Sequence, residues 1–173
     1  MSRVTPIPPG SRPELAAQEA QIGAARGRVS RLYQVLLNSP PVAHGWEQML
    51  SAVRNHNSLP ASLRELVILR VAVLNRANYE FDAHAPIALA AGVSQTVVQL
   101  MCQVPLIEVE QLSQSEQVAI HLTDAMTRDI DVPDALYAQV KEHFNDQGQI
   151  DLVATIAAYN MVSRFLVALQ IGH

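Results

Sequence analysis

Cysteine is almost absent from this chain of 173 residues, which contains Cys102 and no other cysteine. A disulfide within the chain and a metal cluster held by cysteines are therefore both excluded. Charged residues make up only 16% of the sequence, and 12 basic against 16 acidic residues give a net charge of −4. No basic excess is available to bind a nucleic acid backbone or an anionic membrane. We therefore expect neither nucleic acid nor a membrane among its partners.

The sequence also lacks long apolar runs. Its first ten residues, MSRVTPIPPG, do not contain the apolar stretch of about 7 to 15 residues that a secretory signal needs. No later apolar stretch reaches about 18 residues without a charge, so we expect no transmembrane helix. Together with the single cysteine, these features predict a cytoplasmic protein.

Hydrophobic residues, at 49% of the chain, are abundant for a single domain of this length. A domain this apolar has more apolar surface than its interior hides, which predicts that it forms an oligomer. Residues 1–12 contain Pro6, Pro8, Pro9 and Gly10 and are predicted to be a flexible arm or a strap over a neighbouring subunit. Residues 13–173 are predicted to form one helical domain.

Apolar residues recur at helical spacing along most of the chain, which predicts an all-α fold. The helix over 60–75 is apolar nearly all round after Glu65, so we expect it to be the most buried element. The segment 104–112 alternates like a strand, but a lone strand has no partner, so we interpret it as a loop. The predicted helices cover residues 14–28, 29–37, 40–55, 60–75, 79–91, 94–103, from Ser113 or Ser115 to 128, 133–144 and 149–169.

The best candidates for chemistry follow the most buried helix. Glu80 and His84 are four residues apart, so they share one face of a helix. A carboxylate beside an imidazole can move protons near neutral pH. Such a spacing also arises by chance, and an exposed pair contributes only about a few tenths of a kcal/mol. The apolar sequence on both sides favours a pair that lines a pocket.

Two further side chains are candidates for binding a substrate. Tyr79 can donate a hydrogen bond to a carboxylate or an oxyanion, although an aromatic residue here also fits core packing. Arg164, four residues after Asn160, is either a structural or interface ion-pair partner or, for an anionic substrate, a clamp. We expect no metal, because the Glu-x-x-His pairs of di-iron bundles are absent.

The stretch from Arg64 to Gly92, RELVILRVAVLNRANYEFDAHAPIALAAG, resembles the core signature of the carboxymuconolactone decarboxylase and alkylhydroperoxidase D (AhpD) family. In the redox-active branch of that family a Cys-x-x-Cys pair precedes the histidine, and here Ala77 and Glu80 occupy those two positions. The resemblance is therefore to the branch without the thiol pair, whose decarboxylases also carry a carboxylate four residues before the histidine. It implies an all-helical AhpD-like domain in a homo-oligomer, typically a trimer or hexamer.

The resemblance further implies a cofactor-free lyase or isomerase acting on a small anionic substrate, a carboxylated lactone or keto acid. His84 would be its general base or proton shuttle, Glu80 would orient His84, and Glu65 would share or relay the proton. Glu65 also completes a Ser-x-x-Glu capping box with Ser62, so a structural role for it stays open. Two other functions stay open: an antioxidant protein without the thiol pair, and a non-catalytic ligand-binding oligomer.

Overall fold

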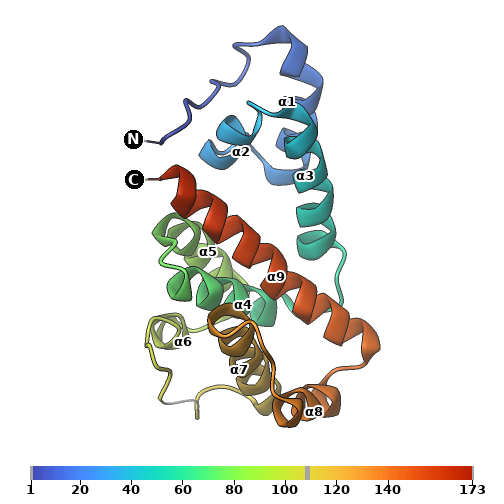
Figure 1. Cartoon of the computed structure of the whole chain (residues 1–173), viewed down its shortest axis with the longest axis vertical. Helices are drawn as coiled ribbons and strands as arrows, with labels where there is room; N and C mark the ends of the chain where they lie inside the picture. Colours follow the sequence, from blue (N-terminus) through green and yellow to red (C-terminus); the bar gives the residue numbers. More distant parts are fainter. Residues whose placement is uncertain (1, 108–109, 173) are drawn as a thin grey trace.

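The computed structural model describes residues 2–107 and 110–172, and every regular element in this part of the chain is helical (Figure 1). The predicted all-α fold is therefore confirmed. The predicted loop over 104–112 contains no strand in the residues described, and its residues 108 and 109 lie outside them. A short 3-10 turn, Pro13–Leu15, precedes the α-helices α1 (Ala16–Arg26), α2 (Arg31–Leu36), α3 (Pro40–Asn55), α4 (Ala61–Leu74), α5 (Asn78–Ala90), α6 (Gln95–Leu100), α7 (Gln114–Arg128), α8 (Asp134–His143) and α9 (Asp146–Leu169).

Local sequence signals set several of these boundaries. Ser113 and Glu116 form a capping box at the start of α7, in which the Ser113 N–H donates to the Glu116 carboxylate at 2.8 Å. The Ser94 hydroxyl accepts from the Val97 N–H at 3.2 Å and begins α6. Gly92, with φ of +93°, follows the end of α5 in the left-handed conformation that favours glycine.

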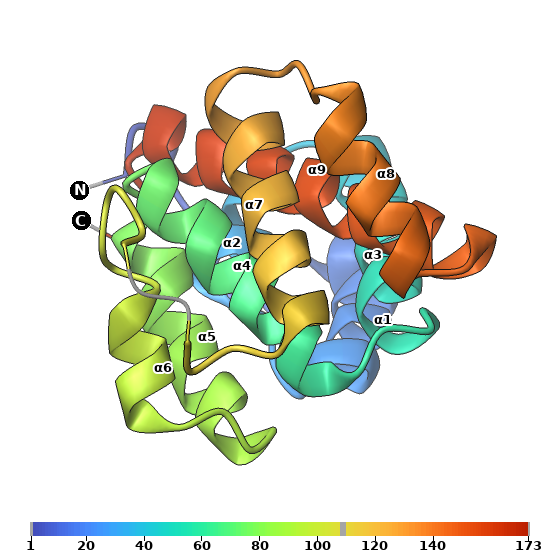
Figure 2. The ribbon, with the colours of Figure 1, turned by 90° about the horizontal axis from the view of Figure 1, so that it is seen from below.

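The long helix α4 lies at the centre of the domain, as its apolar sequence predicts. Figure 2 shows it among α5, α7 and α9, and it contacts all three. One apolar cluster joins α1, α2 and α3 to α4, α7 and α9, and a second lies between α4, α5, α6 and α7. Because α4 contributes to both clusters, it connects the upper and lower parts of the molecule in Figure 1.

A fully buried cation, Arg70 of α4, is bonded to the backbone of Met101, a member of the second cluster. Its guanidinium donates to both carboxylate oxygens of Asp124 on α7, each at 2.6 Å. The same side chain donates to the backbone carbonyls of Met101 at 3.0 Å and Gln103 at 2.5 Å, just after α6. Arg70 therefore ties together three segments, with its charge matched by one carboxylate.

Residues 2–12, which the sequence predicts to be a flexible arm or a strap over a neighbour, lie against their own chain. The Arg3 N–H donates to the Leu169 carbonyl at 2.8 Å, and the Arg3 guanidinium donates to Ala168 at 2.9 Å. The Ile7 N–H donates to a carbonyl of α2 at 2.9 Å, and the Ile7 side chain is buried. The arm thus connects the end of α9 to α2.

Helix α9 is long and apolar enough to cross a membrane, by length and composition alone, and no other helix in the described chain passes that test. Half of its most apolar stretch of 18 residues is buried inside the domain. Buried side chains recur along it at helical spacing, including Leu152, Ile156, Tyr159 and Leu166. This pattern is that of a core helix.

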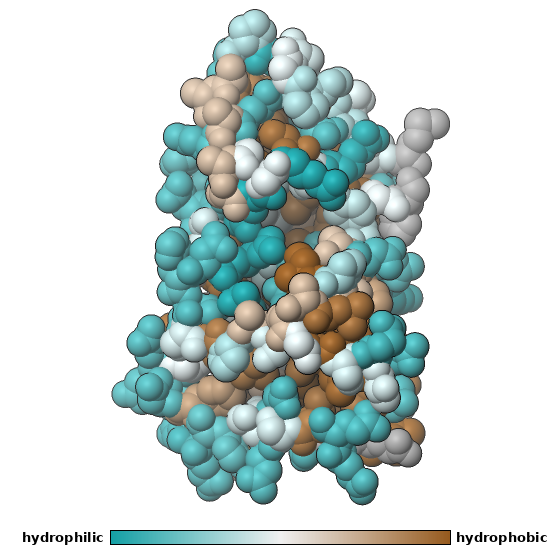
Figure 3. Space-filling view, turned by 180° about the vertical axis from the view of Figure 1, so that it is seen from behind, coloured by the Kyte–Doolittle hydropathy of each residue, from teal (hydrophilic) through white to brown (hydrophobic). Residues whose placement is uncertain are grey.

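Apolar side chains also reach the surface. Figure 3 shows them among polar residues on the face opposite to that of Figure 1. Exposed apolar residues of α5 and α9 include Ile87, Leu89, Met161 and Val167. The homo-oligomer expected from the sequence stays a prediction, and such exposed apolar surface is consistent with it.

Candidate active site

A helical hairpin formed by α4 and α5 builds the candidate site. The chain leaves α4 at Leu74, turns at Arg76 with φ of +57°, and enters α5 at Asn78. The break that the sequence predicts over 75–78 is therefore confirmed. Because the two helices run back along each other, Glu65 near the start of α4 meets His84 of α5, 19 residues later.

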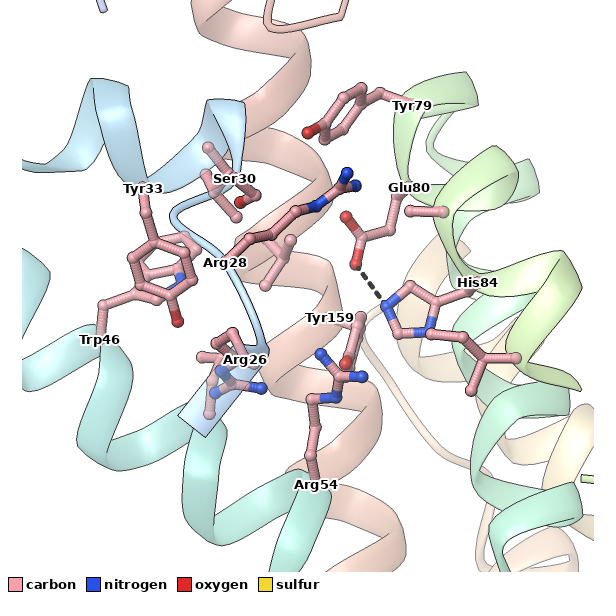
Figure 4. A pocket seen from close by; sticks show the side chains of 15 residues that line it. Arg26, Arg28, Ser30, Tyr33, Trp46, Arg54, Tyr79, Glu80, His84 and Tyr159 are labelled. Atoms are coloured by element: carbon pink, nitrogen blue, oxygen red, sulfur yellow. Dashed lines mark ion pairs between the residues drawn. The ribbon is translucent and has the colours of Figure 1, made fainter. Parts of the chain in front are cut away.

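His84 lies between two carboxylates. Its Nδ1 is 2.6 Å from Oε2 of Glu65, and its Nε2 is 3.2 Å from Oε1 of Glu80 (Figure 4 shows the second pair). All three side chains are buried: Glu65 is 1% exposed and His84 is 4% exposed. Carboxylates accept hydrogen bonds, so this arrangement suits an imidazolium that donates from both ring nitrogens. We call these three residues the Glu–His–Glu site.

The alternative role of Glu65 as a capping residue is wrong. Helix α4 begins at Ala61, with Pro60 at the N-cap and no side chain bonded to the cap. Ser62 therefore lies inside the first turn, two positions after the N-cap. The Glu65 carboxylate instead bonds to His84, and its other oxygen is 3.7 Å from Nε of Arg64.

The surroundings of His84 favour its charged form. Burial alone would lower the pKa of His84, but the hydrogen bonds to Glu65 and Glu80 and their negative charges outweigh it. The pKa of His84 therefore lies above its ordinary value of about 6.5. The charged, proton-donating form of His84 is therefore more stable here than in a free imidazole. Among the residues described, no three His, Cys, Asp or Glu side chains are grouped to hold a metal ion.

We predict that this site makes stability fall as pH rises. Because the pKa of His84 is higher in the folded than in the unfolded chain, its stabilising effect is complete below about pH 6.5 and disappears as pH passes through the folded pKa. Urea unfolding between about pH 6 and pH 9 measures this loss. In Glu80→Gln one carboxylate that raises the folded pKa of His84 is gone, so the fall should be smaller and should end at a lower pH. A fall that is identical in this variant and the parent would contradict the assignment.

The Glu–His–Glu site opens into a cavity of about 210 Å³. Glu80, His84 and Tyr79 line one side of it, so the structure brings the predicted binding residue Tyr79 to the catalytic candidates. Glu65 lies behind His84 and does not line the cavity. Arg164 is exposed on α9 and is also absent from the lining, so the structure does not bring it to the site.

The opposite side of the cavity comes from residues that the sequence analysis did not select. Three arginines reach it from distant segments: Arg26 at the end of α1, Arg28 in the following turn and Arg54 in α3. Figure 4 shows their guanidinium groups around the cavity. In the sequence Arg26 and Arg28 belong to GAARGRVS, at the end of the helix predicted over 14–28. The structure ends that helix at Arg26, so Arg28 lies in the turn before α2. Trp46, Leu50, Ile87 and Val162 add apolar lining.

Arg26 differs from the other two arginines because it already has a partner. Its Nε is 3.0 Å from the carboxylate of Glu47, which also accepts a hydrogen bond from the Tyr33 hydroxyl. Burial and the hydrogen bond to Glu47 raise the pKa of Tyr33, so its phenol stays neutral and donates. These three residues form a polar network that supports the wall of the cavity, although Nη2 of Arg26 is buried without a hydrogen-bond partner.

The single cysteine, Cys102, is exposed. Helix α6 ends at Leu100, and the next residue, Met101, takes the fully buried position. Burial of part of the side chain raises the pKa of the Cys102 thiol, which disfavours the reactive thiolate. Cys102 does not line the cavity.

The fold and the site together define an all-helical domain with a buried Glu–His–Glu site at the α4–α5 hairpin. The profile of the carboxymuconolactone decarboxylase family matches residues 40–119, which include that hairpin. The uncharacterized protein YdfG of Bacillus subtilis is 30% identical over 115 residues, covering 65% of this chain and 77% of YdfG. The chain belongs to the carboxymuconolactone decarboxylase family, in its branch without a Cys-x-x-Cys pair.

Solved structures share the fold at low sequence identity. A putative antioxidant defence protein AhpD from Agrobacterium tumefaciens is 22% identical, with a TM-score of 0.72 over 79% of this chain and 93% of that one. The debrominase Bmp8, solved in complex with 2,3,4-tribromopyrrole, is 14% identical, with a TM-score of 0.81 over 99% of this chain and 91% of its own. These likenesses confirm the AhpD-like fold. They do not fix the reaction, because one fold supports several chemistries.

Proposed function

We propose that this protein is a cofactor-free lyase or isomerase that transfers a proton to or from a small carboxylated lactone or keto acid. The observation that carries the proposal is the buried His84 held between Glu65 and Glu80 at the wall of a cavity. Membership of the decarboxylase family supports the same class of reaction.

In this proposal the three residues have different roles. When a carboxylate leaves as carbon dioxide, the electron pair of the broken C–C bond stays on the substrate as an enolate, which must take up a proton. Glu80 lines the cavity and is hydrogen-bonded to the His84 imidazolium, so a proton can pass from His84 through Glu80 to that carbon. Glu65 stabilises the imidazolium from behind, and solvent returns the proton. His84 is thus the shuttle of this scheme, and Glu80 is the residue that reaches the substrate.

A turnover panel of carboxylated lactones and keto acids in D₂O tests the proposal. A decarboxylase should release carbon dioxide and place one deuteron on the carbon that lost it, and an isomerase should place the deuteron without releasing gas. Both products are measured by mass spectrometry. If no member of the panel is turned over or exchanged while acids do bind, the protein is a non-catalytic binder and the proposal fails.

We predict that dithiol-dependent hydroperoxide reduction stays at background. Ala77 and Glu80 occupy the positions of the two reactive sulfurs, and a single exposed thiol has no partner within the chain to resolve a sulfenic acid. Cys102→Ser should therefore change nothing in a coupled peroxidase assay. Peroxide turnover that disappears in Cys102→Ser would instead favour an antioxidant function.

A further inference from the structure

We propose that Arg54 and the hydroxyl of Tyr159, with Arg28 at the rim, form a carboxylate-binding site opposite Glu80 and His84. The ligand class is a small ring-sized organic acid, held by its carboxylate against the arginines with its apolar body between the two walls. This deepens the proposed function by naming the groups that select the substrate, and it rests on that function for the place of the reacting carbon.

The two arginines bring uncompensated charge to the cavity. Among the residues that the structure describes, no carboxylate lies within ion-pair distance of Arg28 or Arg54, whereas Arg26 is paired with Glu47. Arg54 is only partly exposed, and Figure 4 shows its guanidinium pointing into the cavity beside Tyr159. A guanidinium is suited to bind a carboxylate through two parallel hydrogen bonds.

The charge balance of the site favours an anion. The cavity wall and the groups bonded to it carry three carboxylates and four cations, counting His84 as charged, so one positive charge is left over. The carboxylates are Glu47, Glu65 and Glu80, and the cations are Arg26, Arg28, Arg54 and His84. The Glu–His–Glu site alone has a net negative charge and would repel an acid, but the arginines make the net charge of the whole cavity positive.

Tyr159 supplies a second, independent pointer to a ligand. Its side chain is 98% buried, given a relative exposure of 2%, and it lines the cavity. The ring packs edge-on against His84, with 5.3 Å between the centroids. In the described part of the chain, its hydroxyl makes no hydrogen bond to another protein group, so it is free to donate to a ligand in the cavity that Tyr159 lines. Burial raises the pKa of Tyr159, so the hydroxyl remains a neutral donor.

The size of the cavity limits the ligand. A volume of about 210 Å³ equals that of roughly seven liquid water molecules, at about 30 Å³ each. This is below the range of about 300 to 1,000 Å³ typical for drug-sized ligands. Trp46, Leu50 and Ile87 supply apolar contacts for a flat or cyclic body. A ring with one carboxylate therefore matches both the volume and the lining.

Binding of 4-fluorobenzoate, compared with 4-fluorobenzamide, tests this inference by ¹⁹F NMR titration at low salt. The two probes share shape and differ in charge. We expect saturable binding of the acid with a Kd on the order of 1 mM or tighter, and at least about tenfold weaker binding of the amide. Equal affinities, or no saturation by the acid up to about 10 mM, would overturn the proposal.

Variants then locate the carboxylate. Arg54→Gln should weaken binding of the acid about tenfold or more, and Tyr159→Phe, which removes only the hydroxyl, should weaken it about threefold to tenfold. Binding of the amide should change little in Arg54→Gln. Arg128→Gln, the same charge change at an exposed arginine that does not line the cavity, is the matched control and should bind as the parent does.

The direction in which one further variant changes binding of the acid separates this inference from the proposed function. Glu80→Gln removes a negative charge from the cavity, so it should bind 4-fluorobenzoate as tightly as the parent or more tightly, although it should lose turnover. If Arg54→Gln and Tyr159→Phe bind the acid normally, the carboxylate site is refuted while the proton-handling role of Glu80 and His84 still stands on its own assay. Failure of the turnover panel with intact acid binding gives the reverse result.

Discussion

Glu80→Gln and His84→Gln are each expected to lower turnover by a factor on the order of 10² to 10⁴ on any substrate that the protein accepts. Glu80 and His84 are hydrogen-bonded to each other at 3.2 Å and serve one proton path, so breaking either link stops the same step. The double variant should therefore be hardly slower than either single variant, and kcat in a double-mutant cycle measures this.

The control for this cycle lies on the same helix. Asp82 is exposed on α5, two residues from Glu80, and Asp82→Asn makes the same chemical change without touching the cavity. It should turn over at the parent rate. Melting temperatures of all variants should stay close to that of the parent, because glutamine can still hydrogen-bond. Normal turnover in both single variants, or their unfolding, would make the pair structural and remove the enzyme hypothesis.

Glu65 is expected to act through His84, as a positioning residue. Glu65→Gln removes one of the two carboxylates that raise the pKa of His84, so activity that needs charged His84 should be lost at a lower pH than in the parent. A purely structural role would lower activity equally at every pH. The pH profile of kcat therefore distinguishes the two roles.

The sequence was a good guide to whatever depends on neighbours along the chain. The apolar run over 60–75 predicted a buried helix because periodicity and burial are local properties, and the structure confirms α4 at the centre. Ser94 and Ser113 predicted helix starts for the same reason. Glu80 and His84 were found because four residues is one helical turn. The meeting of Glu65 with His84 came from the family resemblance, since no spacing rule links residues 19 apart.

Residues that meet only through tertiary packing escaped sequence analysis. Arg28 and Arg54 reach the cavity from the turn after α1 and from α3, and no local pattern places either beside α5. Tyr159 looks like one more apolar residue of α9, and only the structure shows its hydroxyl without a partner at the cavity wall. Arg164 illustrates the opposite case: it was a candidate clamp for an anionic substrate, yet it is exposed and does not line the cavity, whereas Asn160 one turn earlier is buried. Long cationic side chains reach water readily from the edge of a buried face.

Arg70 carries the largest stability effect that we expect. A fully buried arginine must have its charge matched inside the protein, and Asp124 is its one carboxylate partner among the residues described. Asp124→Ala should leave the fully buried guanidinium without a counter-charge and lower the free energy of unfolding by about 3 to 5 kcal/mol. That is a large part of the roughly 5 to 15 kcal/mol that stabilises a typical domain.

Removing Arg70 and removing Asp124 should not destabilise the protein equally, because the loss depends on how well water can solvate the charge that remains. Arg70→Met leaves Asp124, whose side chain is 20% exposed and can turn toward solvent, so it should cost only about 1 to 3 kcal/mol. The double variant Arg70→Met with Asp124→Leu should be more stable than Asp124→Ala alone, since no charge is left buried, although the Met101 carbonyl loses its donor. Urea unfolding of the four proteins, with exposed Asp82→Ala as control, measures these differences. If the free energy of unfolding of Asp124→Ala lies within about 1 kcal/mol of the parent, or if Arg70→Met is the more destabilising change, this prediction is wrong. The main effect of Asp124 is then not to neutralise the buried charge of Arg70.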